Sequence, residues 1–361
     1  MTGPSKGSWT CIRREGDGGE RVSSVKRDLG TDNDLQGQGK VEIDLGSENP
    51  NIEYVRYETP SAFRKAGVFL PKDILEMELY EYRLSPYMGC AKRCRYCFEL
   101  HNEFIDRDQV KIKTNTVEVV KKTMGKLEGA KAVLLDGYDC EAAEVEENLI
   151  RRSLEVILEY RLPLFIQTKS DLVLRDLDLL RELNDSVGFV NVSFSLTDLN
   201  LEHSRIFEPY TCSPQDRIRA MKRISQEGIM TGILLMPVLP FISDTGEELE
   251  RTFAAASQGG CHYIVHEPLK LTSRGPQREM FFDVLGEHFP HLVERYEHLY
   301  PRNVYPQKFG SGPSDAGYLR ELSDRMEVMA DRFGIPTRFP EPEFGETSII
   351  SRRQNTLDDF I

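Results

Sequence analysis

Short apolar stretches alternate with amphipathic stretches along the middle of this chain, and this alternation constrains the fold more than any other feature. The apolar stretches are predicted to be strands, and the amphipathic stretches have the spacing of helices with one buried face. Strands in series with helices form a parallel sheet with right-handed crossovers, so the chain is predicted to have an α/β fold. Six such units are too few for an eight-fold barrel, which favours a curved, partly open (β/α)6 barrel. Strands are expected at residues 82–87, 130–135, 164–168, 188–196, 230–238 and 262–266. Helices are expected at residues 116–127, 144–160, 172–184, 213–226 and 247–257.

The composition divides the chain into five parts. Residues 1–50 are rich in Gly, Ser, Asp and Asn and have few large apolar side chains, so this N-terminal segment is expected to be disordered. After it we expect a lead-in segment at 51–80, the barrel at 81–270, a C-terminal helical extension at 271–339 with helices at 279–300 and 316–332, and a tail at 340–361.

Three cysteines follow the first expected strand with the spacing C-x3-C-x2-C: Cys90, Cys94 and Cys97. Iron–sulfur clusters usually have four cysteine ligands. Three thiolates on one loop can hold three irons of a [4Fe–4S] cluster and leave the fourth iron open to another ligand. Two alternatives remain: a zinc site with His101 as the fourth ligand, and free buried cysteines.

The cysteine spacing, with Tyr96 just before the last cysteine, resembles that of the radical S-adenosylmethionine (SAM) superfamily. The resemblance implies a radical SAM barrel, a [4Fe–4S] cluster, SAM bound to the open iron, and a low-potential electron donor. It also implies reductive cleavage of SAM to a 5′-deoxyadenosyl radical.

Polar residues at the ends of the later strands are the candidates for binding SAM, together with Tyr96. Lys169 closes the third strand and is well placed to meet a carboxylate, or it reaches solvent at the strand end. Ser193 and Ser195 alternate with Phe194, so both hydroxyl groups share one face of the fourth strand. Facing inward, they would bind the ribose or the carboxylate; facing outward, they are packing spacers.

Several segments resemble the spore photoproduct lyase-like branch of this superfamily more closely. In that lyase the radical acts on a thymine dimer in DNA, and a cysteine downstream of the cluster quenches the product radical. The resemblance therefore implies DNA as substrate and Cys140, which follows the second strand, as a hydrogen-atom donor; the alternative is a buried cysteine acting as a small apolar side chain. The similar segments are 85–90, 168–170, 174–180, 192–197, 236–240 and 310–313.

The last residues resemble a peptide that binds the sliding clamp PCNA. In a one-turn 3₁₀ helix Leu357 and Phe360 lie on the same side, where they can enter one apolar pocket while Gln354 forms a hydrogen bond beside it. Ile361 occupies the position after Phe360. The alternatives are a frayed amphipathic end and a terminus that folds back on the barrel.

The charge and composition limit the surroundings in which the chain works. The net charge of −13 argues against a surface coated with basic residues for nucleic acid. A basic run (Lys111, Lys113, Lys121, Lys122, Lys126, Lys131) is read as a solvated helix face rather than a phosphate track. No apolar stretch is long enough to span a membrane, and seven cysteines with three in a cluster favour a reducing, cytoplasmic location.

The sequence leaves three functions open. The first is a radical SAM enzyme that acts on damaged or modified DNA, like a photoproduct lyase, and is recruited by the sliding clamp. The second is a radical SAM enzyme that acts on an RNA base, a peptide or a small metabolite. The third is a non-enzymatic, metal-stabilised protein that binds the clamp.

Overall fold

The computed structural model describes residues 9–16, 19–27, 41–44, 49, 51–65, 80–97, 106–124, 132–302 and 310–340. The candidate clamp-binding residues Gln354, Leu357, Phe360 and Ile361 lie outside these ranges, as does the alternative zinc ligand His101.

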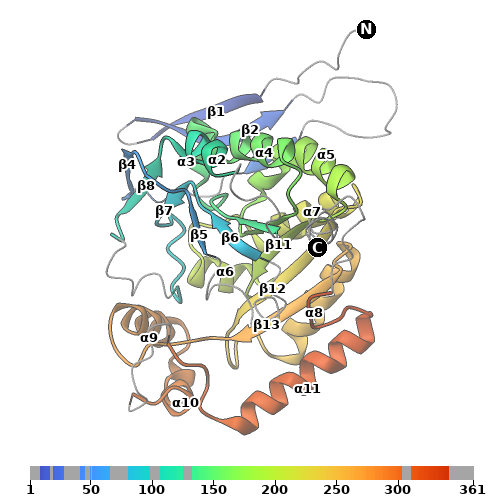
Figure 1. Cartoon of the computed structure of the whole chain (residues 1–361). Helices are drawn as coiled ribbons and strands as arrows, with labels where there is room; N and C mark the ends of the chain where they lie inside the picture. Colours follow the sequence, from blue (N-terminus) through green and yellow to red (C-terminus); the bar gives the residue numbers. More distant parts are fainter. Residues whose placement is uncertain are drawn as a thin grey trace, which may run out of the picture.

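A seven-stranded sheet forms the centre of the fold (Figure 1). Six of its strands pair in parallel, and β5 is added antiparallel to β6 at one edge. This confirms the predicted α/β fold with six parallel strands. In spatial order the strands are β13 (Tyr263–Pro268), β12 (Met230–Val238), β11 (Val190–Leu196), β10 (Leu164–Thr168), β9 (Ala132–Leu135), β6 (Tyr80–Leu84) and β5 (Phe63–Lys65).

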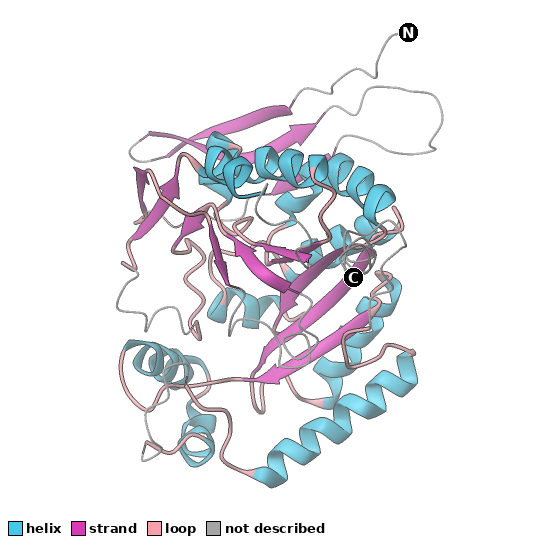
Figure 2. Cartoon of the chain, in the orientation of Figure 1, coloured by secondary structure: helices cyan, strands magenta, loops and turns pink. Residues whose placement is uncertain are grey.

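Helices cover the outer face of this curved sheet (Figure 2). Val133, Ile166 and Val192 are fully buried on that face, in one apolar cluster with residues of the surrounding helices. The helices among the strands are α2 (Thr116–Met124), α3 (Glu141–Glu147), α4 (Leu149–Glu159), α5 (Leu177–Val187), α6 (Leu201–Phe207), α7 (Pro214–Ser225) and α8 (Gly246–Gln258), with the 3₁₀ helix η2 at Asp171–Asp176. The C-terminal extension holds α9 (Pro276–His288), η3 (Pro290–Leu292), α10 (Val293–Leu299) and α11 (Ala316–Phe333).

A second apolar cluster fills the inner face of the sheet at the start of the strands. Phe339, which follows α11, packs against Phe165 and Tyr263 with ring centroids 5.9 and 4.8 Å apart. The backbone amide of Ile264 also donates to the carbonyl of Pro336, 3.0 Å away. The end of the extension therefore closes the amino-terminal end of the barrel and leaves functional groups to gather at the carboxyl ends of the strands.

Three predicted helices are divided. The helix expected at 172–184 consists of η2 followed by α5. The helix expected at 144–160 breaks at Asn148, which adopts a left-handed conformation with φ of 54° that asparagine tolerates well. The carboxylate of Glu144 accepts a hydrogen bond from the backbone amide of Ile150 at 2.9 Å and so caps α4. The helix expected at 279–300 breaks before Pro290, because proline cannot donate the backbone hydrogen bond that a helix needs.

A small sheet that the sequence analysis did not expect lies beside the barrel. It contains β4 (Glu53–Tyr57), β7 (Tyr87–Met88) and β8 (Gln109–Lys113) in the order β4-β8-β7. Lys113, part of the basic run, is buried here and donates to the carbonyl of Ser85 at 2.5 Å, so it is not available to a phosphate.

Three strands also lie within the N-terminal segment that was expected to be disordered, and the structure differs from that expectation for these ranges. They are β1 (Trp9–Gly16), β2 (Gly19–Arg27) and β3 (Val41–Asp44), which form an antiparallel sheet in that order. Gly16 pairs with Gly19 where β1 and β2 adjoin.

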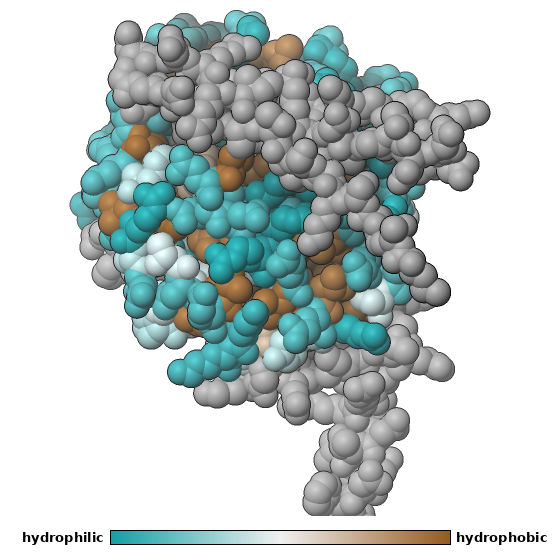
Figure 3. All heavy atoms as spheres, turned by 90° about the horizontal axis from the view of Figure 1, so that it is seen from above, coloured by the Kyte–Doolittle hydropathy of each residue, from teal (hydrophilic) through white to brown (hydrophobic). Residues whose placement is uncertain are grey.

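In the part of the chain that the structure describes, no helix is both long and apolar enough to cross a membrane. On the face seen from above, mostly hydrophilic side chains surround scattered apolar ones (Figure 3).

Candidate active site

The loop that carries the three cysteines follows β6 at the carboxyl end of the parallel strands. β7 pairs with β8 just before this loop and anchors its start. Gly89 has φ of +94°, and a Cβ atom there would lie 2.6 Å from the carbonyl oxygen of Gln109. Only glycine therefore lets the chain turn this close to β8 and lead directly into Cys90.

The three cysteines lie along one loop. Cys90 interacts electrostatically with Cys94, and Cys94 with Cys97, so the thiols are neighbours along one loop. Among the described residues, no three His, Cys, Asp or Glu side chains converge as ligands of one metal ion. Burial raises the pKa of Cys94 to about 12, so this thiol must lose a proton when it binds iron.

Next to Cys94, a buried polar network joins four elements of the barrel. The Lys169 ammonium donates to the hydroxyl of Ser195 at 2.7 Å and to the carboxylate of Glu208 at 3.0 Å. Tyr96 donates its hydroxyl hydrogen bond to the same oxygen of Glu208. The other carboxylate oxygen of Glu208 accepts from the guanidinium of Arg217 at 2.6 Å. This network brings together three of the predicted SAM-binding residues: Tyr96, Lys169 and Ser195.

Glu208 stays ionised because two cations face it. Burial alone would raise its pKa, but Arg217 and Lys169 lower it to about 2. One carboxylate thus faces two positive charges in this network. An ammonium has three N–H donors, and the two hydrogen bonds of Lys169 to Ser195 and Glu208 leave one for a further acceptor at the barrel mouth.

The loop after β9 packs against the cysteine loop from the other side. Lys92, between Cys90 and Cys94, forms a buried ion pair with Glu141. The thiol of Cys140 lies 3.7 Å from the carbonyl oxygen of Gly89. Burial raises the pKa of Cys140, so this thiol keeps its hydrogen at neutral pH.

Asp139 ties the same loop to the end of β10. Its carboxylate accepts hydrogen bonds from the backbone amide of Lys169 at 2.7 Å and from the hydroxyl of Thr168 at 2.9 Å. A second thiol, that of Cys212, donates to the carbonyl of Lys169 at 3.0 Å. Lys169 is therefore held on its backbone as well as on its side chain.

Ser193 does not join this network. It shares one face of β11 with Ser195, as the alternation predicts, and that face is the inner one. Its fully buried hydroxyl is bonded to Asn191 and Tyr263 near the closed end. Its position gives no support to a role in binding SAM. Glu208 and Arg217, which complete the network, were missed because no local pattern distinguishes them from other charged residues on or beside helices.

Comparison with known proteins identifies the family. Residues 84–256 match the model of the radical SAM superfamily. An uncharacterized protein of Mycobacterium bovis is 30% identical over 237 residues, which are 63% of this chain and 69% of that protein.

The chain belongs to the radical SAM superfamily.

The chain is also similar to another relative and to two solved structures. An uncharacterized protein of Methanocaldococcus jannaschii is 30% identical over 171 residues, 45% of this chain and 62% of that protein. A cysteine mutant of spore photoproduct lyase has a TM-score of 0.56 at 16% identity, over 72% of this chain and 77% of that one. A mutant of the same lyase with bound AdoMet and dinucleoside spore photoproduct has a TM-score of 0.53 at 16% identity, with the same coverage. At this identity the likeness shows a shared fold.

Membership of the radical SAM superfamily implies a [4Fe–4S] cluster and SAM, and it supports an enzyme. The three cysteine donors fit that cluster, and the Lys169 network lies at the barrel mouth beside one of them.

Proposed function

We propose that this radical SAM protein binds SAM between the cysteine loop and the Lys169 network and acts on a damaged or modified base in DNA. The observation that carries the proposal is the remaining donor of Lys169 within a buried network that holds two cations and one carboxylate. Such a network matches the carboxylate of SAM, because a charge-assisted hydrogen bond to it would offset the second cation.

When bound, the cluster and SAM would supply one electron and the 5′-deoxyadenosyl radical. Cys90, Cys94 and Cys97 would hold three irons of the cluster. Lys169 would bind the SAM carboxylate, while Ser195 and Glu208 fix the direction of its ammonium group. Tyr96 would keep the end of the cysteine loop against this network through its hydrogen bond to Glu208.

Cys140 would give the hydrogen atom of its S–H bond to the product radical, and the unpaired electron would then reside on Cys140 as a thiyl radical. Its position beside Gly89 and its protonated state support this role, because a thiol gives up a hydrogen atom readily and a thiolate has none to give.

We expect Cys140→Ala to form 5′-deoxyadenosine at the wild-type rate but to release altered or trapped substrate products. Cys261→Ala is the matched control, because that thiol follows α8 and donates to the carbonyl of Tyr263. Product analysis by mass spectrometry would contradict the role if C140A and wild type gave the same products.

Two features support DNA as the substrate. One of the solved structures with the same fold is a lyase mutant with a bound dinucleoside photoproduct. The C-terminal sequence has the pattern of a sliding-clamp peptide, which would bring the protein to sites of replication and repair. The net charge of −13 instead favours a second candidate, a radical SAM enzyme for an RNA base, a peptide or a small metabolite.

The direct test is anaerobic reconstitution of the cluster, followed by incubation with SAM, a reductant and UV-irradiated DNA. We expect DNA-dependent formation of 5′-deoxyadenosine and loss of a photoproduct. If 5′-deoxyadenosine forms equally with and without DNA and every lesion persists, the second candidate holds. If none forms at all, the SAM-binding assignment of Lys169 fails as well.

A further inference from the structure

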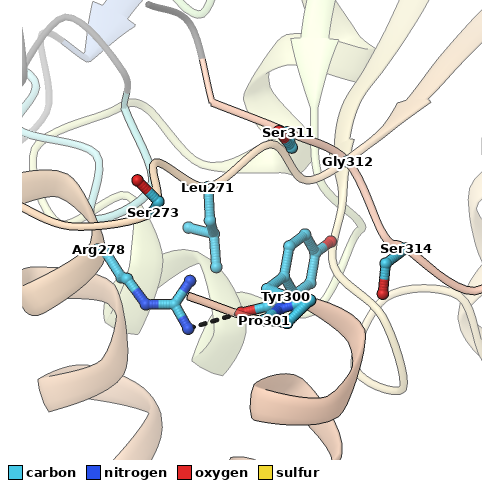
Figure 4. Close-up of a pocket in the computed structure, with 8 residues that line it drawn as sticks. All are labelled: Leu271, Ser273, Arg278, Tyr300, Pro301, Ser311, Gly312 and Ser314. Carbon is cyan, nitrogen blue, oxygen red and sulfur yellow. Dashed lines mark hydrogen bonds between the residues drawn. The ribbon is translucent and has the colours of Figure 1, made fainter. Parts of the chain in front are cut away.

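A small pocket lies beside the first turn of α9, outside the Lys169 network (Figure 4). It contains about 260 Å³ of empty space that opens to solvent. The segment after β13, the first turn of α9, the residues after α10 and the loop before α11 all contribute to its wall. Its polar lining consists of Arg278, Ser273, Ser311 and Ser314, and the ring of Tyr300 forms part of the remainder.

Arg278 is the buried charge of this pocket. Only 3% of its surface is exposed. Its guanidinium donates to two backbone carbonyls, of Tyr300 at 2.7 Å and of Thr272 at 3.5 Å, and one face lies 4.5 Å from the ring centroid of Phe282. Its Nε–H is buried without a hydrogen-bond partner among the described residues. Carbonyls satisfy N–H groups but do not neutralise a charge, and in the described part of the chain no carboxylate is hydrogen-bonded or ion-paired to this guanidinium.

A second positive charge, that of Arg302, acts on the guanidinium of Arg278. Burial lowers the pKa of Arg278, and the exposed Arg302 lowers it further, whereas the carboxylate of Glu297 acts in the opposite direction. The local field at the pocket therefore includes two arginines and one carboxylate that is not bonded to Arg278. Such a site gains from an anionic ligand.

The wall opposite Arg278 is shaped by a loop with a glycine requirement. Gly310 has φ of +74°, and a Cβ atom there would lie 2.8 Å from the backbone of Leu271. This close approach lets Ser311 and Leu271 exchange two backbone hydrogen bonds of 2.9 and 3.0 Å. The pairing fixes Ser311 at the pocket, and Ser314 follows on its exposed rim.

The pocket is connected to the cysteine loop through the neighbour of Arg278. Gln277 is fully buried and donates to the carbonyl of Tyr96 at 2.8 Å and to that of Lys270 at 2.9 Å. Its side-chain oxygen accepts from the backbone amide of Thr272 at 2.9 Å. One side chain thus fixes the start of α9 against the loop that holds the cluster, so the pocket lies beside the barrel mouth rather than at its closed end.

We propose that this pocket binds a phosphate group of a nucleic-acid substrate. Guanidinium and hydroxyl groups are donors that match phosphate oxygens, and a phosphodiester supplies the missing negative charge. The apolar ring of Tyr300 suits the sugar next to that phosphate. The proposal rests on the proposed function for its substrate class, since a nucleic acid held here by its backbone would have a base near the barrel mouth.

The test measures binding of a short oligothymidylate to the full chain with its cluster, by fluorescence anisotropy at low salt. Arg278→Gln is expected to weaken binding about tenfold, because it removes a charge-assisted contact to phosphate. Arg320→Gln, which removes an equal charge from the exposed surface of α11, should leave binding within about twofold. An oligothymidylate with uncharged methylphosphonate linkages should bind wild type no better than it binds R278Q.

A second pair of variants keeps the test decisive if R278Q does not fold. Ser314 is exposed at the rim, so Ser314→Asp should fold normally and repel a phosphate, whereas the uncharged Ser314→Asn should bind as wild type. Equal oligonucleotide affinity of S314D, S314N and wild type overturns the proposal. Inorganic phosphate that binds in an Arg278-dependent way without competing with the oligonucleotide also overturns it, because the pocket would then serve free phosphate.

SAM cleavage at a saturating concentration of UV-irradiated DNA, measured on the same preparations, distinguishes failure of the phosphate pocket from failure of the radical chemistry. Normal cleavage in R278Q with weakened oligonucleotide binding supports both the phosphate pocket and the radical chemistry. Absent cleavage in wild type with intact Arg278-dependent binding would overturn the proposed function and leave the phosphate pocket standing.

Discussion

At the scale of single residues, Glu208 has the largest part in organising the site. It is buried and binds Tyr96 of the cysteine loop, Lys169 at the end of β10 and Arg217 on α7. Three elements that are far apart in the sequence are therefore held by one carboxylate. Glu208 acts as a positioning residue, since it sets the direction of the ammonium group that is proposed to meet SAM.

Replacement of Glu208 by glutamine should destabilise the protein in a pH-dependent way. The pKa of Glu208 is about 2 in the fold and about 4.5 ordinarily, so its ionised form contributes about 3 kcal/mol of stability near neutral pH. Because the folded pKa is depressed, this contribution is present above about pH 4.5 and is lost as the pH falls through about 2. The difference in free energy of unfolding between wild type and E208Q should therefore narrow between pH 7 and pH 3. Urea unfolding at both pH values measures it.

Glu202→Gln is the control for this experiment, since Glu202 is an exposed carboxylate in the first turn of α6. Its effect should stay within about 0.5 kcal/mol. If the difference in free energy of unfolding between wild type and E208Q is the same at all pH values, the pKa of Glu208 is not lowered in the fold. Combining E208Q with Lys169→Arg tests the direction of the ammonium group. If E208Q weakens SAM binding and the added Lys169→Arg restores none of the lost affinity, SAM binding depends on the geometry of the Lys169 ammonium group and not on its charge alone.

At the scale of elements, the sequence predicts uninterrupted strands and helices equally well, since α7 and α8 lie within one residue of their expected bounds. The strand expected at 82–87 is wrong at its end, because β6 ends at Leu84 and Tyr87 starts β7 in the small sheet. β10 and β12 begin and end where their apolar runs do, because a buried parallel strand is apolar on both faces. The helix at 144–160 fails at Asn148 because the break depends on a cap supplied by the buried Glu144 side chain. The pairing of β4 with β8 joins segments more than fifty residues apart, which no local pattern reveals.

The residues of the candidate site also divide into those that a local sequence pattern reveals and those that depend on long-range packing. The cysteines, Tyr96, Lys169 and Ser195 are recognisable because they stand at fixed places relative to a motif or a strand end. Glu208 and Arg217 owe their roles to long-range packing, in which a charge becomes important only when it is buried beside another. Ser193 shows the converse limit: alternation gives the face of a residue but not its depth in the barrel.

Gly89→Ala should weaken cluster binding while the barrel stays folded. The residue has φ of +94° and no room for a Cβ atom next to Gln109, so alanine must shift the start of the cysteine loop. The backbone conformation alone costs about 1–2 kcal/mol. We expect lower iron and sulfide per chain after reconstitution and weaker absorption near about 400 nm, with an unchanged far-UV circular dichroism spectrum.

Gly286→Ala is the matched control. Gly286 lies in α9, where an added Cβ atom meets nothing within 4 Å. Alanine there should leave the iron content unchanged and stabilise the helix by about 0.5–1 kcal/mol. Full iron and sulfide in G89A would show that the close approach to β8 does not determine the position of Cys90.

At the scale of the whole molecule, the two ends of the barrel have different tasks. Phe339 and Tyr263 close the amino-terminal end with aromatic packing, while charged and thiol groups gather at the carboxyl end. The C-terminal extension therefore contributes to both: its last residues complete the core, and its first helix holds the cysteine loop through Gln277. Truncation before Phe339 should for this reason impair folding.

This separation makes the tail a clean target for testing recruitment by a sliding clamp. The chain carries a net charge of −13, so general attraction to DNA is weak and a specific tether would raise the local concentration of substrate. Deletion of 354–361 is expected to abolish capture by an archaeal or eukaryotic-type clamp and to leave SAM cleavage unchanged, because none of the predicted cluster-binding, SAM-binding or catalytic residues lies in the tail. Leu357→Ala with Phe360→Ala should lower clamp affinity at least about tenfold, since these two side chains are the apolar anchors. Asp358→Ala, between the anchors, should retain capture. Clamp binding that survives the deletion, measured by surface plasmon resonance, would show that the tail is not the recruiting element.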